Sequence, residues 1–121
     1  MSILVVDDSS TMRRIIINSL NRLGFKHFHE ASNGREGLER LATTMVDLII
    51  TDWHLPEMSG IEFVRAVRSN AAIKHLPVLM VTSNAAEDDI VEAHRAGVNN
   101  YLVKPFTPDT IREKVQAALT A

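Results

Sequence analysis

The sequence contains no cysteine, which excludes disulfide bonds and thiolate metal sites. It has no block of like charge long enough to form a nucleic-acid arm or a membrane patch, and its formal net charge is only -2. Bulk electrostatics therefore favour neither nucleic acid nor an anionic membrane as a partner. No apolar run approaches the ~20 residues of a membrane span, and Asp7 and Asp8 interrupt what would be a signal-peptide core. These absences leave a cytoplasmic, monomeric domain as the expectation.

The chain has the size and balance of one ordinary folded domain. It holds 121 residues, of which 45% are hydrophobic and 23% charged. No linker or low-complexity stretch divides it, so we expect a single domain over residues 1–121. Because the last predicted helix reaches the end of the chain, we expect no effector domain after it.

Apolar, strand-like runs alternate five times with helical periodicity, which indicates an α/β fold with a doubly wound parallel sheet. The predicted strands are Ile3–Val6, Lys26–Ala31, Val46–Thr51, Val78–Val81 and Asn100–Val103. The five predicted helices start at Ser9 or Ser10, at Asn33-Gly34, at Gly60, at Glu87 and at Thr107-Pro108. The first, third and fourth helices are expected to end near Gly24, Ser69 and Gly97. The second is expected to bury Leu38 and Leu41.

The periodicity of the helices predicts which side chains are buried. The first helix is expected to bury an apolar stripe made of Met12, Ile15, Ile16, Leu20 and Leu23. In the third helix, Ile61, Val64 and Val67 are expected to face inward, with Arg65 and Arg68 outward. We also expect Arg13 and Arg14 on a solvated helix face.

Polar side chains follow the apolar strands where each strand ends. The run Leu48–Ile50, which lacks polar alternation, stops at Thr51-Asp52, and Ile3–Val6 runs directly into Asp7-Asp8. Since parallel strands end at the same edge of a sheet, these carboxylates, Thr82 and Lys104 should meet there. Singly, each acid has a plain structural explanation as a helix cap or strand end. Their joint occurrence favours a site.

Crowded carboxylates need a compensating charge. Each close pair of carboxylates repels by roughly 4 kcal/mol at an effective dielectric constant of 20. Oxygen ligands with room for water and phosphate favour Mg²⁺ over a softer metal. We therefore expect Mg²⁺ at Asp7, Asp8 and Asp52.

Several motifs resemble a known family. They are Val5-Val6-Asp7-Asp8, Asp52 with Pro56 and Gly60 after it, Thr82-Ser83 and Lys104-Pro105-Phe106. Together they resemble the receiver domain of two-component response regulators, over essentially the whole chain. Asp7 to Arg14, Asp52-Trp53 and Ala96 to Tyr101 are similar, more narrowly, to stand-alone chemotaxis regulators of the CheY type. The resemblance implies a flavodoxin-like, CheY-like sheet with strand order 2-1-3-4-5, an order taken from the known CheY fold.

The resemblance also implies a chemistry. Asp52 would accept a phosphoryl group from a CheA-like sensor histidine kinase, making the protein a signalling switch that catalyses only its own phosphorylation and autodephosphorylation. The backbone carbonyl of His54 would join the three aspartates as a Mg²⁺ ligand. Lys104 would neutralise the phosphoryl group, and the Thr82 hydroxyl would move to hydrogen-bond it. The Lys104-Pro105 bond would be cis.

The implied output is a change of surface. Tyr101 would turn inward once Thr82 has moved, altering the face of helix four, strand five and helix five, represented by Ile90, Tyr101, Val103 and Lys114. The implied role is chemotaxis control of flagellar rotation, with the flagellar motor switch protein and a phosphatase as further partners. Arg13 and Arg14 would contribute to docking of the kinase or the phosphatase.

At several positions the sequence departs from the motifs of the receiver family, and these departures leave other functions possible. His54 and Asn84 occupy variable positions that govern water access to the phosphoryl group, which leaves the phosphoryl lifetime undefined. Ala86-Glu87 stand where the best-known motor-binding members carry two lysines, so a receiver in a non-chemotaxis phosphorelay, or one acting only as a scaffold, stays possible. A Mg²⁺-dependent phosphohydrolase needs a second acid where the chain has His54. A flavodoxin-like cofactor binder needs a phosphate-accepting first loop, which Asp7-Asp8 would oppose.

Overall fold

The computed structural model describes residues 1–83 and 86–120. Strands and helices alternate along the chain as β1 (Ser2–Val6), α1 (Ser10–Arg22), β2 (His27–Ala31), α2 (Gly34–Thr43), β3 (Leu48–Asp52), α3 (Gly60–Ser69), β4 (Val78–Thr82), α4 (Glu87–Ala96), β5 (Asn100–Val103) and α5 (Pro108–Leu119). All strand pairs are parallel, in the order β2-β1-β3-β4-β5. The predicted fold class and strand order are confirmed.

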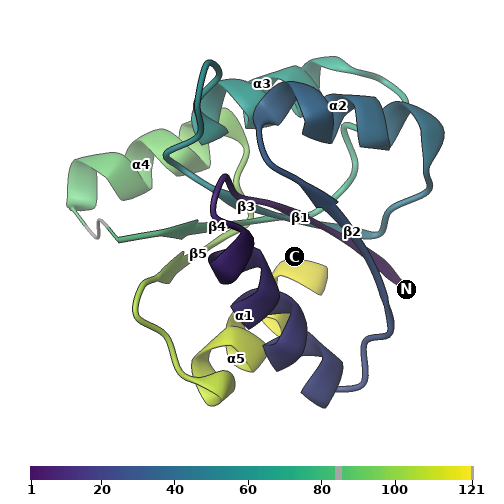
Figure 1. The fold of residues 1–121 in the computed structure, drawn as a ribbon. Helices are drawn as coiled ribbons and strands as arrows, with labels where there is room; N and C mark the ends of the chain where they lie inside the picture. The colour runs from purple at the N-terminus through teal and green to yellow at the C-terminus, as the bar shows by residue number, and fades with distance from the viewer. Residues whose placement is uncertain (84–85, 121) are drawn as a thin grey trace.

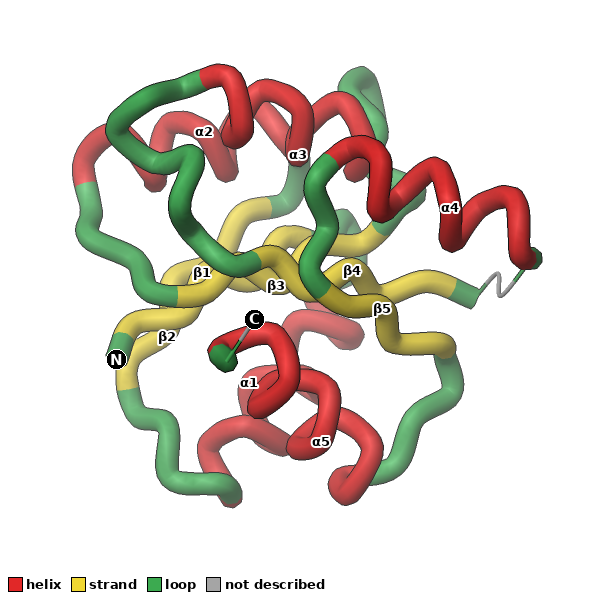
Figure 2. The backbone as a smooth tube through the Cα atoms, turned by 180° about the vertical axis from the view of Figure 1, so that it is seen from behind, coloured by secondary structure: helices red, strands yellow, loops and turns green. Residues whose placement is uncertain are grey.

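The sheet lies between two layers of helices. Figure 1 shows α2, α3 and α4 on one face and α1 with α5 on the other, and Figure 2 shows the same layers from behind. Alternate residues of each strand feed the two cores: Leu4 and Val6 pack beneath α2 and α3, whereas Ile3 and Val5 pack against α1 and α5. Both faces are covered, which explains why the strands lack polar alternation. Among the described residues, no helix is both long and apolar enough to cross a membrane.

Two strands begin later than predicted. β2 starts at His27 instead of Lys26, and β3 starts at Leu48 instead of Val46. The register of β1 with β3 begins at the pair Ile3 and Leu48, so Val46 lies beyond the reach of a partner strand. Its side chain is nonetheless buried, in the core formed with α2 and α3. Val46 is apolar because it is buried in this core, and an apolar residue so close to Leu48 resembles part of the strand in the sequence.

The helix starts are fixed by side-chain caps. The hydroxyl of Ser9, and not that of Ser10, accepts the amide of Met12 at the start of α1. Ser59 and Glu62 form a capping box at the start of α3. At the other end of α4, Gly97 has a φ of 109°, the left-handed conformation that favours glycine. The caps of α1 and α3 set where the loops after β1 and β3 end, at the carboxyl edge of the sheet, whereas Gly97 ends α4 at the opposite edge.

Two predicted orientations are wrong. Ile15 is 45% exposed, because α1 presents Ile16 and Leu20 to the sheet and to α5. The guanidinium of Arg68, predicted to face solvent, turns inward and donates to the backbone carbonyls of Gly97 at 2.8 Å and Leu76 at 2.6 Å. It thereby satisfies carbonyls at the end of α4 and before β4, and burial lowers the pKa of the Arg68 guanidinium.

The start of α3 is pressed against the end of β3 at Gly60. A Cβ atom added to Gly60 would lie 2.2 Å from the carbonyl oxygen of Asp52 and 2.9 Å from Cα of Trp53, both backbone atoms that cannot rotate away. We expect Gly60→Ala to lower the free energy of unfolding by about 3 kcal/mol, as severe overpacking does, measured by urea denaturation.

Gly37→Ala is the matched control. An added Cβ there meets side-chain ring atoms of Phe63 at 3.0 Å, a much milder approach than the 2.2 Å to backbone at Gly60, and a helical Gly→Ala change gains up to about 1 kcal/mol. The Gly37 variant should stay within about 1 kcal/mol of the parent. Equal stability of the two variants would contradict the close approach of α3 to Asp52.

Candidate phosphoacceptor and metal site

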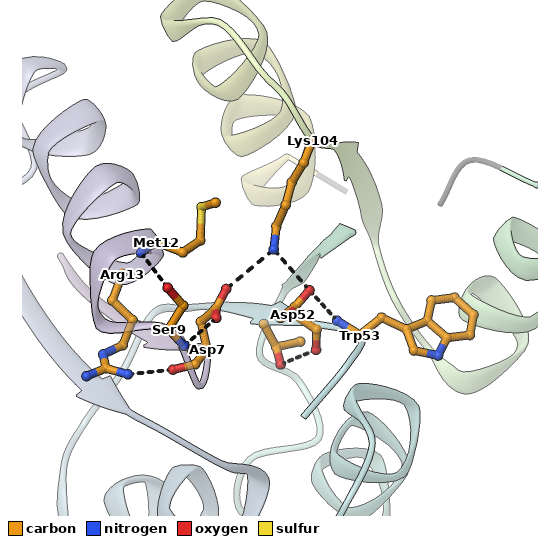
Figure 3. Close-up of polar contacts among 8 residues, drawn as sticks. Asp7, Ser9, Met12, Arg13, Asp52, Trp53 and Lys104 are labelled. Atoms are coloured by element: carbon orange, nitrogen blue, oxygen red, sulfur yellow. Dashed lines mark hydrogen bonds and ion pairs between the residues drawn. The ribbon is translucent and has the colours of Figure 1, made fainter. Parts of the chain in front are cut away.

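Four strands deliver polar side chains to one edge of the sheet. Asp52 and Thr82 are the last residues of β3 and β4, while Asp7 and Lys104 directly follow β1 and β5. Asp7, Asp8 and Asp52 each offer a carboxylate oxygen, and these oxygens lie within 4.8 Å of one another. The parallel topology thus brings Asp7, Asp8, Asp52 and Lys104 together, as the sequence predicted. Figure 3 shows Asp7 and Asp52 with Lys104 between them.

Lys104 lies between two of the acids. Its Nζ atom is 3.4 Å from Oδ1 of Asp52 and 3.6 Å from Oδ2 of Asp7 (Figure 3). The backbone amide of Trp53 donates to the same Oδ1 of Asp52 at 3.0 Å. Asp7 and Asp52 are buried, whereas Asp8 is exposed at the mouth of the cluster. The three carboxylates and the Lys104 ammonium together carry a net charge of about -2 when all are ionised.

The two oxygens of Asp7 have different surroundings. Oδ1 accepts the backbone amide of Ser9 at 2.9 Å. Oδ2 is buried and has no hydrogen-bond partner in the described part of the chain. Burial raises the pKa of the Asp7 carboxyl; the Ser9 hydrogen bond and Lys104 oppose this rise, and the charges of Asp52 and Asp8 add to it.

This donor set fits a hard divalent cation. A buried carboxylate oxygen without a hydrogen bond is costly, and a cation bound there would satisfy it. The ligand atoms offered by Asp7, Asp8 and Asp52 are all oxygens, which Mg²⁺ prefers. A divalent ion would also neutralise the excess negative charge that Lys104 leaves. The residues are therefore compatible with the expected magnesium site.

Thr82 and Tyr101 already interact. Both side chains are buried, and the exposed fraction of Tyr101 is 7%. Burial raises the pKa of the Tyr101 hydroxyl, a side-chain hydrogen bond with Thr82 lowers it, and the charge of Asp89 raises it further. The Tyr101 ring also makes an edge contact with Trp53, with centroids 6.5 Å apart. The sequence did not predict this contact, which links the residue after Asp52 to β5.

The other predicted site residues surround this centre. His54 is exposed in the loop after β3, and the Lys104-Pro105 peptide bond is cis, as the resemblance implied. Ile90 and Lys114 are half-buried, and Val103 is 36% exposed. Asn84 lies outside the described residues.

One residue of the site was placed wrongly by the sequence. Arg13, expected on a solvated face, has a largely buried side chain that pairs with Glu30. It also donates to the backbone carbonyl of Asp7 (Figure 3). The parallel register that aligns Val5 with Glu30 is what brings β2 beside the end of β1. Only that register, had it been known, would have identified Glu30 as the partner.

The fold and the acid cluster define a class of signalling domain. Residues 3–116 match the model of the response regulator receiver domain family, and the chain belongs to this family. More narrowly, it is a receiver domain of the type found in CheY chemotaxis response regulators.

Relatives of known name agree with this classification. The chain is 53% identical over 116 residues to the chemotaxis protein CheY of Pseudomonas aeruginosa, covering 96% of this chain and 94% of that protein. It is 48% identical over 120 residues to CheY1 of Helicobacter pylori, covering 98% and 97%. The solved structure of the chemotaxis response regulator CheY4 of Vibrio cholerae superposes with a TM-score of 0.91 at 36% identity, covering 98% of both chains.

The raised pKa of Asp7 predicts a pH-dependent penalty. Because the folded state holds the Asp7 proton more tightly than the unfolded chain, stability is lost as pH rises from the ordinary value of 3.8 through the raised pKa. Asp7→Asn removes this penalty, so the metal-free variant should unfold at a higher temperature than the parent at pH 7, with the difference shrinking as pH falls toward 3.8. Thermal unfolding followed by circular dichroism in EDTA tests this. A metal-free variant that is less stable than the parent at pH 7 would contradict it.

Proposed function

We propose that this chain is a stand-alone response regulator, activated when Asp52 accepts a phosphoryl group from the phosphohistidine of a CheA-like sensor kinase. The observation that carries this proposal is the pairing of Lys104 with both Asp52 and Asp7. The Asp7 oxygen in this pair, Oδ2, is buried and accepts no hydrogen bond from any residue that the structure describes. An aspartate held in this way is surrounded by the charges that phosphoryl transfer requires. Similarity to named chemotaxis proteins supports the same function.

Asp52 acts as the nucleophile in this proposal. A carboxylate oxygen forms a bond to phosphorus as the bond between phosphorus and the histidine nitrogen breaks, which leaves an aspartyl phosphate. The Trp53 amide holds Oδ1 of Asp52 at 3.0 Å and so limits rotation of the carboxylate. The Lys104 ammonium, 3.4 Å from the same oxygen, is placed to compensate charge on the transferred group.

Mg²⁺ is the cofactor of this proposal. Asp7, Asp8, Asp52 and the backbone carbonyl of His54 would hold the ion. When bound, it supplies charge compensation for the phosphoryl oxygens. The chain's own contribution is to keep the Asp7 carboxylate directed toward the site by the Ser9 amide, at 2.9 Å.

The output follows from the link between Thr82 and Tyr101. Phosphorylation adds about -1.5 to -2 charges at Asp52 and would draw the Thr82 hydroxyl away from Tyr101, with which it shares a hydrogen bond. Tyr101, which is already buried against Trp53, would then lose this hydrogen bond and shift. The surface made by Ile90, Tyr101, Val103 and Lys114, here called the output surface, would change as a result. A large population shift needs several kcal/mol, which contacts of the phosphoryl group to Lys104 and Thr82 would help to supply.

The proposed partners follow from this output. The chain would work in the cytoplasm as a monomer, receive its phosphoryl group from the kinase, and present its output surface to a flagellar motor switch protein, with a phosphatase shortening the signal. His54, beside the acceptor, would influence the phosphoryl lifetime.

A specific observation favours a non-chemotaxis phosphorelay as the second candidate. The first turn of α4 carries Glu87, Asp88 and Asp89. These acids stabilise the helix start through its dipole, but they also make this end of the output surface negative, where the best-known motor-binding members carry lysines. A target selected by this surface would be complementary to negative charge.

We predict that acetyl phosphate labels Asp52 in the presence of Mg²⁺, because the domain itself supplies the nucleophile and the compensating charge. Intact mass spectrometry should show the addition of one phosphoryl group, and Asp52→Asn should abolish it. Asp47→Asn, at the opposite end of the same strand and exposed, is the matched control and should be labelled like the parent. Equal labelling of Asp52→Asn would refute the assignment.

A second prediction concerns coupling. Thr82→Ala should still accept the phosphoryl group at Asp52, yet show smaller phosphorylation-induced amide shifts across the output surface and a weaker gain in affinity for a target. Thr82→Ser keeps the hydroxyl and should behave like the parent. If phosphorylated Thr82→Ala gave the same shifts as the phosphorylated parent in heteronuclear NMR spectra, coupling through Thr82 and Tyr101 would be wrong.

A further inference from the structure

Arg13 joins three segments beside the acid cluster. Its side chain is only 16% exposed. Nε donates to Oε1 of Glu30 on β2 at 2.9 Å, and Nη1 donates to the backbone carbonyl of Asp7 at 2.5 Å. Arg13 itself lies in the first turn of α1. Figure 3 shows its guanidinium on the side of Asp7 away from Lys104, so Arg13 does not enter the site.

These contacts complete a frame around Asp7. Its amide donates to the carbonyl of Ala31 at the end of β2, at 3.1 Å. Its carbonyl is held by Arg13, which is anchored on Glu30, the residue before Ala31. Its Oδ1 accepts the amide of Ser9. With all three groups engaged, the remaining oxygen, Oδ2, is the one that faces Lys104 at 3.6 Å.

We propose that Arg13, anchored by Glu30, is a positioning residue for the cation site: it fixes the backbone of Asp7 so that Oδ2 is presented as a ligand. This inference rests on the proposed function, because it assigns Arg13 a role toward the Mg²⁺ that Asp7 would bind. Arg13, which the sequence predicted to face solvent, thus has an internal role. Partners that orient a metal ligand contribute ten- to hundredfold to metal affinity.

The role depends on the shape of the guanidinium as well as on its charge. Arginine presents several donors in a rigid plane, so one side chain reaches both Glu30 and the Asp7 carbonyl. A lysine keeps the charge but has a single nitrogen. If Arg13 acts by positioning, Arg13→Lys should behave almost like Arg13→Met. A purely electrostatic role would instead leave Arg13→Lys equal to the parent.

Two readouts on the full chain test this proposal. The first uses metal-free protein: hydrogen exchange of the Asp7 amide should speed up at least severalfold in Arg13→Met, because its bond to Ala31 belongs to the same frame. The second is a Mg²⁺ titration followed by Trp53 fluorescence, in which Arg13→Met and Arg13→Lys should raise the Kd about tenfold. A merely structural role would lower the unfolding temperature without changing the Kd of the folded protein.

Arg22→Met is the matched control. Arg22 is exposed on the same helix, nine residues and roughly 13 Å further along, so the same charge is removed at a distance. This variant should keep the parent's Kd and Asp7 exchange rate. Should Arg13→Met fail to fold, Glu30→Gln removes the anchor and should raise the Kd in the same direction by a smaller factor.

The possible failures can be told apart. If the parent binds Mg²⁺ and Arg13→Met and Arg13→Lys bind it with the parent's Kd, the positioning role of Arg13 is overturned while the proposed function stands. If the parent shows no saturable Mg²⁺ response, the proposed function itself fails, and this inference fails with it.

Discussion

The mutual repulsion of the clustered carboxylates is the constraint on which this structure depends. Asp7, Asp8 and Asp52 bring oxygens within 4.8 Å of one another, and within residues 1–83 and 86–120 Lys104 is the cation paired with them. Burial strengthens the problem, because it raises the pKa of Asp7 and removes the water that would screen its charge. A fold that keeps such a cluster gives up stability at the site, and binding of a cation and a phosphoryl group would recover it.

The rest of the domain fixes the positions of these carboxylates. Two apolar cores fix the parallel strands from both faces, so the strand ends cannot separate to relieve the repulsion. Gly60 lets α3 approach the carbonyl of Asp52 closely, and Arg13 ties the loop of Asp7 to β2. On the other side, Trp53 contacts Tyr101, which shares a hydrogen bond with Thr82. The same edge that concentrates charge is thus in physical contact with β4 and β5, which lead to the proposed output surface.

Much of this could be predicted from the sequence, because strand ends are visible as apolar runs that stop at polar residues. Asp52, Thr82 and Lys104 were placed at the correct edge for that reason. The inward turns of Arg13 and Arg68 could not be predicted, since an arginine on a helix normally faces solvent and its partners, Glu30 and Gly97, are distant in the sequence. Ile15 was predicted to be buried because helical periodicity shows which side of a helix is apolar. It does not show how wide the buried part of that side is, which the packing of α1 against α5 decides.

Calorimetric titration of Mg²⁺ into the metal-free chain at pH 7 tests the central claim most directly. We predict one saturable site per chain, because a divalent ion would compensate the charge of the clustered carboxylates. Asp7→Asn and Asp52→Asn should each weaken this binding strongly. Absence of a saturable heat in the parent, or unchanged binding in both variants, would contradict the claim that the carboxylate cluster is a cation site.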